Sequence, residues 1–309
     1  MSDRVPRFAV VALALGLVAA LVGCAGPTRG PDAQGRLRLV ASFYPLQWVT
    51  ERVAGQAVRS LTKPGAEPHD LELSPRDVGA VYDADLVVYL SGFQPSVDQA
   101  VRTEAEHRNL DVRAAARLDL PVSTGSGSEP GAGDSSALDP HFWLDPTRLA
   151  AVADAVARRL AGVDPARAST YLANARSVDA DLASLDHDLR VGLTSCRGSE
   201  LVTSHAAFGY LARRYGLHQV GVTGLSPEGE PSSADLARVA RLVRERGVRT
   251  VYAETLVSPA LARTVAAETG ARTAVLDPVE GLSDASRGHD YLQVMRSNLA
   301  TLRQGQPCP

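Results

Sequence analysis

The chain alternates short apolar runs, rich in β-branched residues, with longer segments in which apolar residues recur at helical spacing. The apolar runs predict strands at 37–42, 57–62 and 85–90 in the first half and at 200–204, 218–224, 249–254 and 271–276 in the second. Strands that alternate with helices favour parallel sheets covered by helices. The pattern therefore predicts an α/β fold with two βα lobes, each built on a mainly parallel sheet.

One long helical pattern separates the two sets of strands. Its apolar residues fall along one side of a helix, and no proline or glycine interrupts it between Pro165 and Gly192: these apolar residues are Leu172, Val178, Leu182, Leu185 and Leu189. A single helix over 164–193 would measure about 40 Å at 1.5 Å per residue and could span two lobes. A helix-turn-helix within the same stretch is the alternative.

These patterns divide the chain into five parts. We expect a leader over 1–23, a tether over 24–36, an N-terminal βα lobe over 37–163, the linker helix over 164–193 and a C-terminal βα lobe over 194–309. Within the first lobe, residues 121–138 are rich in glycine and serine and almost free of large apolar groups. That composition predicts a flexible loop that does not pack.

The first residues have the order of a secretory signal. Arg4 and Arg7 precede an uncharged run over 8–23, which is shorter than the roughly 20 apolar residues that a spanning helix needs. The run ends in the sequence LVGC, which resembles a bacterial lipobox, so we expect cleavage before Cys24 and lipid on that cysteine. A plain signal peptide or a signal anchor is the alternative. A lipidated protein would be exported and held on the outer face of the cytoplasmic membrane.

Charge and hydropathy after the leader exclude some classes of partner. The chain has 32 basic and 35 acidic residues, and no basic face or cluster stands out. This balance argues against a nucleic-acid partner. No membrane-spanning pattern, repeat or coiled-coil heptad follows the leader, so we expect the mature chain to be soluble apart from its anchor.

Two further cysteines, Cys196 and Cys308, would face an oxidising compartment in an exported protein. Cysteines in that setting usually pair, and we predict a disulfide between them. Two free thiols are the alternative. A zinc-ligand role is weaker, because neither residue belongs to a close pair of cysteines or histidines.

Four side chains of metal-binding type stand in loops beside a predicted helix start or strand end. His69 lies in "GAEPHDLELSP", His141 in "LDPHFWLDP" and His205 in "LVTSHAAFGYLARRYG", while Asp277 ends a strand in "TAVLDPVEGL". Loops at the carboxyl ends of two parallel sheets can converge across a cleft. Three neutral imidazoles and one carboxylate suit a tetrahedral divalent cation. We therefore expect a Zn²⁺ site made by His69 and His141 from one lobe and His205 and Asp277 from the other.

Several neighbouring groups would tune such a site. We expect His205 to open a helix, whose N-terminal dipole would keep the imidazole neutral, and we expect metal affinity to fall below about pH 6 as imidazoles protonate. Asp70 and Asp139 are candidate hydrogen-bond acceptors for the metal-binding rings. The reserve candidates for the fourth ligand are Glu228, Glu230 and Glu254.

The chain resembles the metal-binding lipoproteins of bacterial ABC importers for zinc and manganese, the cluster A-I or zinc-uptake solute-binding family. The resemblance covers about 37–302 and includes "SFYPL", "PHDLELSP", "DPHFWLDP", "SHAAFGYLARRYGL", "GLSPEGEPS", "YAETLVSP" and "LDPVEGL". It implies two lobes joined by a rigid long helix, a metal between them, and ligand roles for His69, His141, His205 and Asp277. The implied partner is an ABC permease. A metallochaperone is a further candidate partner, and we expect a monomer.

The residue at position 205 indicates the class of metal. Members that resemble manganese binders have a glutamate there, whereas the zinc group has histidine, as in this chain. Three imidazoles with one carboxylate also suit Zn²⁺ better than Mn²⁺, which prefers more oxygen ligands, although copper and nickel would bind such a set. The chain departs from many zinc members because residues 121–138 contain no histidine. Some members also close the site with a glutamate or water in place of an aspartate.

Two other classes of function use the same residues. A zinc hydrolase would need an open coordination position and a general base, and no HExxH-like stretch supplies one. A surface adhesin or structural lipoprotein could use the metal for stability alone. We expect a metal-binding protein that delivers Zn²⁺ to an importer and is not an enzyme.

Overall fold

The computed structural model describes residues 35–122, 138–225, 227 and 229–308. The expected leader, most of the expected tether with Cys24, and nearly all of the glycine- and serine-rich segment lie outside these residues. Glu228 also lies outside them.

Each lobe contains a four-stranded, fully parallel sheet. In the N-terminal lobe the strands are β1 (Leu39–Ala41), β2 (Arg59–Ser60), β3 (Leu86–Tyr89) and β4 (Asn109–Asp111), in the order β2-β1-β3-β4. In the C-terminal lobe they are β5 (Glu200–Thr203), β6 (His218–Gly221), β7 (Thr250–Ala253) and β8 (Arg272–Val275), in the order β6-β5-β7-β8. All seven expected strands are present, which confirms the α/β reading. The sequence analysis missed β4, whose three residues include one apolar side chain.

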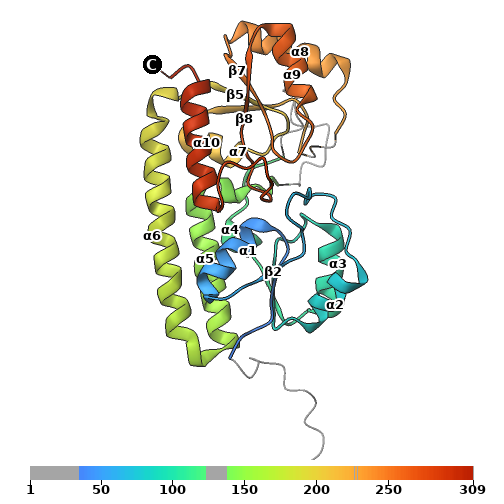
Figure 1. The fold of residues 1–309 in the computed structure, drawn as a ribbon, viewed down its shortest axis with the longest axis vertical. Helices are drawn as coiled ribbons and strands as arrows, with labels where there is room; N and C mark the ends of the chain where they lie inside the picture. The colour runs from blue at the N-terminus through green and yellow to red at the C-terminus, as the bar shows by residue number, and fades with distance from the viewer. Residues whose placement is uncertain (1–34, 123–137, 226, 228, 309) are drawn as a thin grey trace, which may run out of the picture.

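Helices cover both faces of each sheet. The N-terminal lobe contributes α1 (Tyr44–Ala54), α2 (Pro75–Asp83), α3 (Pro95–Glu104) and α4 (Arg113–Ala116), and the C-terminal lobe contributes α7 (Gly209–Tyr215), α8 (Ser233–Glu245), α9 (Ala260–Thr269) and α10 (Tyr291–Gly305). Apolar side chains of α2 and α3 pack on the outer face of the first sheet, and those of α8 and α9 pack on the outer face of the second. Figure 1 shows the two lobes stacked along the long axis of the molecule.

A helical hairpin runs along the side of the molecule and joins the lobes. Helix α5 (Pro146–Val163) descends through the N-terminal lobe, a 3-10 turn follows over Pro165–Arg167, and α6 (Ala168–Gly192) returns past both lobes (Figure 1). One continuous helix therefore fills the segment after that turn, and the helix-turn-helix alternative is wrong. Four residues of the expected apolar stripe are buried, namely Val178, Leu182, Leu185 and Leu189. Leu172 is instead 40% exposed, and its neighbour Tyr171 is buried.

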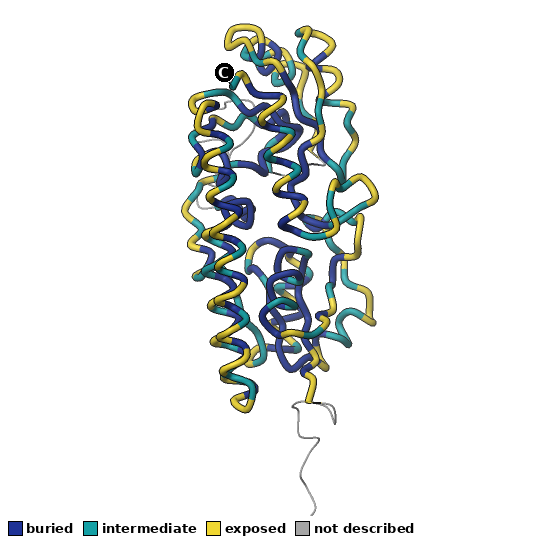
Figure 2. The backbone as a smooth tube through the Cα atoms, turned by 60° about the vertical axis from the view of Figure 1, so that its left-hand side comes forward, coloured by how far each residue is buried: buried dark blue, intermediate teal, exposed yellow. Residues whose placement is uncertain are grey.

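The apolar core is continuous across the two lobes. Phe43 from the first lobe, Leu185 from α6 and Tyr252 from the second belong to one cluster of buried residues. Helix α6 packs against α1 and α5 of the N-terminal lobe and against α10 of the C-terminal lobe. In Figure 2 the buried backbone accordingly extends through both halves of the molecule, whereas the outer surfaces of the hairpin are exposed.

A disulfide between Cys196 and Cys308 closes the C-terminal lobe and confirms the expected pair. It links the tail that follows α10 to the segment just before β5. Among the described residues, no helix combines the length and the apolar character needed to cross a membrane.

Candidate metal centre

His69 lies in the loop that connects β2 to α2. The loop ends in a capping box, in which the Ser74 hydroxyl accepts a hydrogen bond from the Asp77 backbone N–H and the Asp77 carboxylate accepts one from that of Ser74. Helix α2 therefore begins at Pro75. The His69 ring packs edge-on against Phe93, with ring centroids 4.8 Å apart. Its side chain is 9% exposed, so it lies at the edge of the site.

His141 lies immediately before a 3-10 turn over Phe142–Leu144, which leads into α5 at its N-cap, Asp145. The Asp139 carboxylate accepts a hydrogen bond from the His141 backbone N–H at 2.8 Å and lies 2.7 Å from Nδ1 of its ring. His141 is fully buried. The carboxylate therefore fixes the ring orientation and leaves Nε2 to face Glu280.

His205 follows the carboxyl end of β5 and is also buried. Helix α7 begins only at Gly209, so the expected helix start at His205 is wrong; the helix ends at Tyr215, before Gly216. The backbone here bonds elsewhere: Thr203 Oγ1 donates to the His205 carbonyl, and Glu254, at the end of β7, accepts from the His205 backbone N–H at 2.9 Å. The other oxygen of Glu254 contacts Nδ1 of the ring.

The fourth member of the group is Glu280, in the loop after β8. One ligand atom from each of His69, His141, His205 and Glu280 lies within 4.8 Å of the others. Asp277, the expected fourth member, is not among them. Its carboxylate instead accepts a hydrogen bond from the Val279 backbone N–H at 2.8 Å and so shapes the loop that presents Glu280.

The spacing of the four ligand atoms fits a tetrahedral ion. Oε1 of Glu280 lies 2.9 Å from Nε2 of His141, 3.4 Å from Nε2 of His69 and 3.5 Å from Nε2 of His205. Nε2 of His69 and Nε2 of His141 are 3.3 Å apart. Zn–N distances near 2.0–2.1 Å place neighbouring ligand atoms of a tetrahedron about 3.3–3.4 Å apart. These four separations lie close to that value, and the remaining ones do not exceed 4.8 Å.

Burial and mutual charge set the protonation of this group. Burial lowers the pKa of His69. Burial also works against the charged form of His141, but the carboxylates of Asp139 and Glu280 outweigh it and raise the pKa of His141 to about 9. In the same way, Glu254 and Glu280 outweigh burial and raise the pKa of His205. Hydrogen bonds from the imidazoles outweigh burial at Glu280 and hold its pKa well below the usual range.

These directions revise two expectations about the site. No helix N-terminus keeps His205 neutral, and the adjacent carboxylate of Glu254 favours its protonated form. The metal therefore competes with protons at a higher pH than the value near 6 expected for ordinary imidazoles. Of the two proposed acceptors, Asp139 contacts a ring, whereas Asp70 is exposed.

Sequence reasoning missed Glu280 and its neighbour Glu67. Glu67 accepts a hydrogen bond from the His69 backbone N–H at 3.0 Å, and Oε1 of Glu67 lies 3.9 Å from Nε2 of His69. Burial, together with the charge of Glu280, raises the pKa of Glu67 to about 7. Among the reserve candidates, Glu254 lies behind His205 and Glu230 is exposed. The sequence offered one local indication of Glu280, which is its position in a "VEG" stretch between a strand and a helix.

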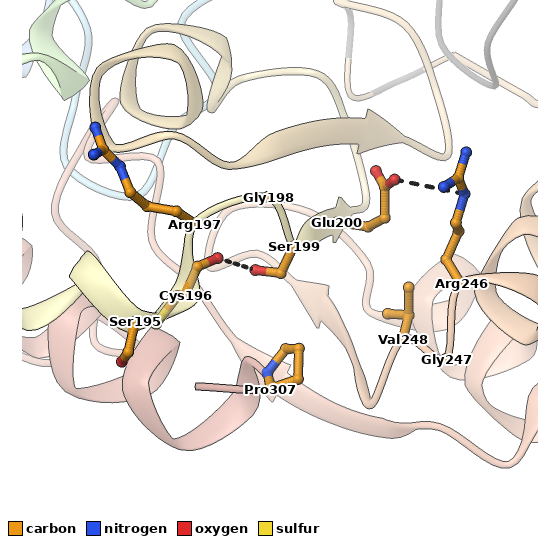
Figure 3. A pocket seen from close by; sticks show the side chains of 10 residues that line it. All are labelled: Ser195, Cys196, Arg197, Gly198, Ser199, Glu200, Arg246, Gly247, Val248 and Pro307. Atoms are coloured by element: carbon orange, nitrogen blue, oxygen red, sulfur yellow. Dashed lines mark hydrogen bonds and ion pairs between the residues drawn. The ribbon is translucent and has the colours of Figure 1, made fainter. Parts of the chain in front are cut away.

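A separate surface pocket is lined by none of the residues of the metal group. It has a volume of about 350 Å³ and lies beside the disulfide, where Glu200 faces Arg246 (Figure 3). Glu200 is the first residue of β5, whereas His205 follows the last. The pocket therefore opens at the opposite end of the sheet from the histidines.

Comparison with protein families identifies one sequence model over nearly all the described chain. The family described as "ZnuA: Zinc-uptake complex component A periplasmic" matches residues 39–305. The high-affinity zinc uptake system protein ZnuA of Bacillus subtilis is 35% identical, and the alignment covers 93% of each chain. The zinc-binding protein AdcA of Streptococcus pyogenes is 34% identical over 88% of this chain but only 56% of AdcA. The chain thus spans little more than half the length of the AdcA relatives.

Solved structures give the same fold. The chain is similar to the laminin-binding adhesin Lmb of Streptococcus agalactiae, with a TM-score of 0.78 and 32% identity over 88% of this chain and 100% of that one. Zn(II)-bound AdcA of Streptococcus pneumoniae superposes with a TM-score of 0.73 and 34% identity, over 88% of this chain and 58% of AdcA. These likenesses agree with the two lobes, the long helix and the fold class expected from the sequence.

Proposed function

Because the chain belongs to the family of periplasmic zinc-uptake complex component A proteins, we propose that it is an extracytoplasmic solute-binding protein that captures Zn²⁺ and delivers it to an ABC-type membrane importer. The observation that carries this proposal is the buried group of three imidazole nitrogens and one carboxylate oxygen at tetrahedral spacing between the lobes. His69, His141, His205 and Glu280 coordinate the ion in this proposal.

Zinc is the cargo that this donor set favours. Imidazole suits Zn²⁺ well, whereas Mn²⁺ prefers oxygen ligands and stands lower in the order of affinities. The relatives named as zinc-binding or zinc-uptake proteins support the same choice. A manganese-specific protein is the alternative within the family, and copper or nickel is kept out by metal supply and by the tetrahedral geometry.

Capture of the metal exchanges protons for the ion. Zn²⁺ enters beside His69, the most exposed ring, and displaces the protons held by His141 and His205. Asp139 and Glu254 hold the two buried rings in the tautomer that presents Nε2. Because α6 packs on both lobes, release requires local loop movement more than rotation of whole lobes. Docking to the permease supplies the contacts that drive this movement.

Lipid on Cys24 would keep the protein close to that permease. The leader ends in the lipobox-like LVGC, and a related protein of Streptococcus pneumoniae is named a zinc-binding lipoprotein. The lipid anchor, the permease, a monomeric state and a metallochaperone as a further partner all belong to this proposal.

The coordination shell favours transport over catalysis. Four protein ligands fill a tetrahedral shell, so no position remains for an activated water or a substrate. Hydrolysis of esters or peptides with zinc-dependent kinetics would contradict the proposal.

The direct test combines metal analysis with competition. The purified protein, stripped of metal, is titrated with Zn²⁺ and Mn²⁺ against a chromophoric chelator. We expect one equivalent of Zn²⁺ to bind more tightly than Mn²⁺. Deletion of the gene should slow growth under strong chelation, and added zinc should restore it. Preference for Mn²⁺, or growth that is unaffected by the deletion, would overturn the assignment.

Adhesion to laminin is a second candidate function. The likeness to laminin-binding adhesins, one of them described as having both adhesin and metal transporting activity, favours it. The test is binding of the zinc-loaded and metal-free protein to immobilised laminin. Binding no stronger than that of an unrelated lipoprotein would remove this candidate.

A further inference from the structure

The Glu280 loop, residues 277–282, is fastened to both histidine loops of the other lobe. It follows β8 and so belongs to the C-terminal lobe. The indole N–H of Trp143 donates to the Pro278 carbonyl at 2.8 Å, and the backbone N–H of Gly65 donates to the Leu282 carbonyl at 2.9 Å. Trp143 belongs to the turn after His141, and Gly65 to the loop before His69. Hydrogen bonds from the N-terminal lobe therefore flank Glu280 on both sides.

The backbone of this loop is strained next to Glu280. Val279 has a φ of 58°, one of two positive φ values among the described non-glycine residues. A β-branched residue adopts this conformation only where its surroundings impose it. Here Asp277 accepts from the Val279 N–H, and Asn298 of α10 both donates to the Asp277 carbonyl and accepts from its N–H.

Trp143 is held in place by its surroundings. Its side chain is fully buried, and its ring centroid lies 5.0 Å from that of Phe43 and 5.9 Å from that of Phe93. The Tyr291 hydroxyl of α10 donates to the Trp143 backbone carbonyl. A donor fixed in this way can hold a strained acceptor loop in one place.

We propose that Trp143 is a positioning residue of the metal centre: its indole N–H holds the Pro278 carbonyl and thereby keeps Glu280 within coordination distance of the three imidazoles. The inference rests on the proposed zinc function, because Glu280 matters here as a ligand. It adds a control on metal release. Breaking this hydrogen bond removes one of the contacts that hold the strained loop, lets Glu280 move away from the imidazoles and weakens the junction between the lobes.

The test removes the indole N–H and leaves the aromatic ring. Trp143→Phe is compared with wild type for the rate of zinc dissociation into excess chelator and for zinc affinity. We expect dissociation to accelerate about tenfold, which corresponds to roughly 1.4 kcal/mol and matches the cost of leaving one buried carbonyl unpaired. Trp48→Phe makes the same chemical change at the other tryptophan of the chain; it keeps an aromatic ring against Tyr291, and hence the Tyr291 hydrogen bond to Trp143, so the rate should be unchanged.

A double-mutant cycle separates positioning from general packing. In a Glu280→Ala background the same Trp143→Phe change should have little further effect on zinc dissociation, because the group that Trp143 positions is gone. An equal acceleration in both backgrounds would show a packing effect and overturn the proposal. An unchanged dissociation rate in the single variant would also overturn it.

A second variant covers the case in which Trp143→Phe does not fold. In the Trp48→Phe protein Trp143 is the sole tryptophan, so biosynthetic replacement by benzothienylalanine exchanges only its N–H for sulfur. We expect the same acceleration, and an unchanged rate would refute the role of the N–H. Failure of the unsubstituted protein to bind zinc would instead refute the proposed function, which keeps the two conclusions distinguishable.

Discussion

Nε2 of His141 lies 2.9 Å from Oε1 of Glu280, although 139 residues separate them in the chain and they belong to different lobes. Neither residue has a ligand partner within its own loop. The metal group therefore exists only when both sheets have formed and the lobes are docked. Binding of Zn²⁺ should accordingly stabilise the junction between the lobes as well as each loop.

Replacement of Glu280 should damage the site far more than replacement of Asp277. Glu280→Ala removes a direct oxygen donor, and we expect zinc affinity to fall by more than about 100-fold, beyond the 10–100-fold loss typical of groups behind a ligand. Asp277→Asn keeps an oxygen that can accept from the Val279 N–H, so we expect affinity within about threefold of wild type. Isothermal titration with a competing chelator measures both variants. The reverse order of effects would return Asp277 to the shell.

Replacement of Asp139, which contacts the His141 ring, should lower zinc affinity, whereas replacement of the exposed Asp70 should not. Asp139→Asn weakens the contact to Nδ1 of His141, and we expect a 10- to 100-fold loss of zinc affinity, in the range known for groups that orient metal-binding histidines. Asp70→Asn, one residue after His69, serves as the matched control because Asp70 is exposed. Equal losses in the two variants would point to overall charge in place of ring orientation.

Zinc binding should release protons well above pH 6.5. The pKa of His141 is raised to about 9 and that of His205 is also raised, so both rings hold protons in the metal-free protein at neutral pH. We expect a net release of protons on Zn²⁺ binding at pH 7.5, read from the dependence of binding enthalpy on buffer ionisation enthalpy.

The sign of the pH dependence follows from the same protons. As pH rises towards 9 His141 begins to lose its proton, so apparent affinity should increase and proton release should decline. His141→Gln should release fewer protons than wild type under the same conditions. An affinity that is flat between pH 7 and 9 would contradict the charge assignment.

Loss of the disulfide should destabilise the fold without weakening the metal site. Cys196 and Cys308 are 112 residues apart, and closing a loop of that size contributes roughly 4–5 kcal/mol in the chain-entropy model. Cys196→Ser with Cys308→Ser should therefore lower the thermal midpoint of the metal-free protein markedly. Zinc affinity at 25 °C should change little, because the bond lies at the opposite end of β5 from His205. A large loss of affinity in a folded variant would show that the two ends are coupled.

Most of the fold follows from local patterns along the chain. The seven expected strands consist of apolar runs, and the starts of α2 and α5 follow from Ser74-Pro75 and Asp145-Pro146, whose capping geometry is local. Strand β4 was not predicted because its sequence, Asn-Leu-Asp, has no apolar run. Its extended conformation is stabilised by pairing with β3. The start of α7 escaped because a side-chain bond from Thr203 and a contact from Glu254 hold the preceding loop.

The metal group was predictable to the extent that its members stand beside regular elements. Three histidines beside strand ends or helix starts come together as expected. Glu280 was not found, because its direction depends on Val279 adopting a left-handed conformation that a β-branched residue avoids on its own. Asp277 had the better local position at the end of a strand, but its carboxylate is used within the loop. Long-range contacts with α10 and Trp143 decide between them.

The single helix shared by both lobes limits what a receptor can detect. Since α6 packs on α1, α5 and α10 at once, large changes in the outline of the protein would expose apolar surface and cost free energy. We expect the metal-free and the zinc-bound protein to have nearly the same arrangement of the two lobes. A transporter that must distinguish the two forms would have to contact the loops that carry the metal-binding residues. It would therefore recognise the conformation of those loops and not the overall shape of the protein.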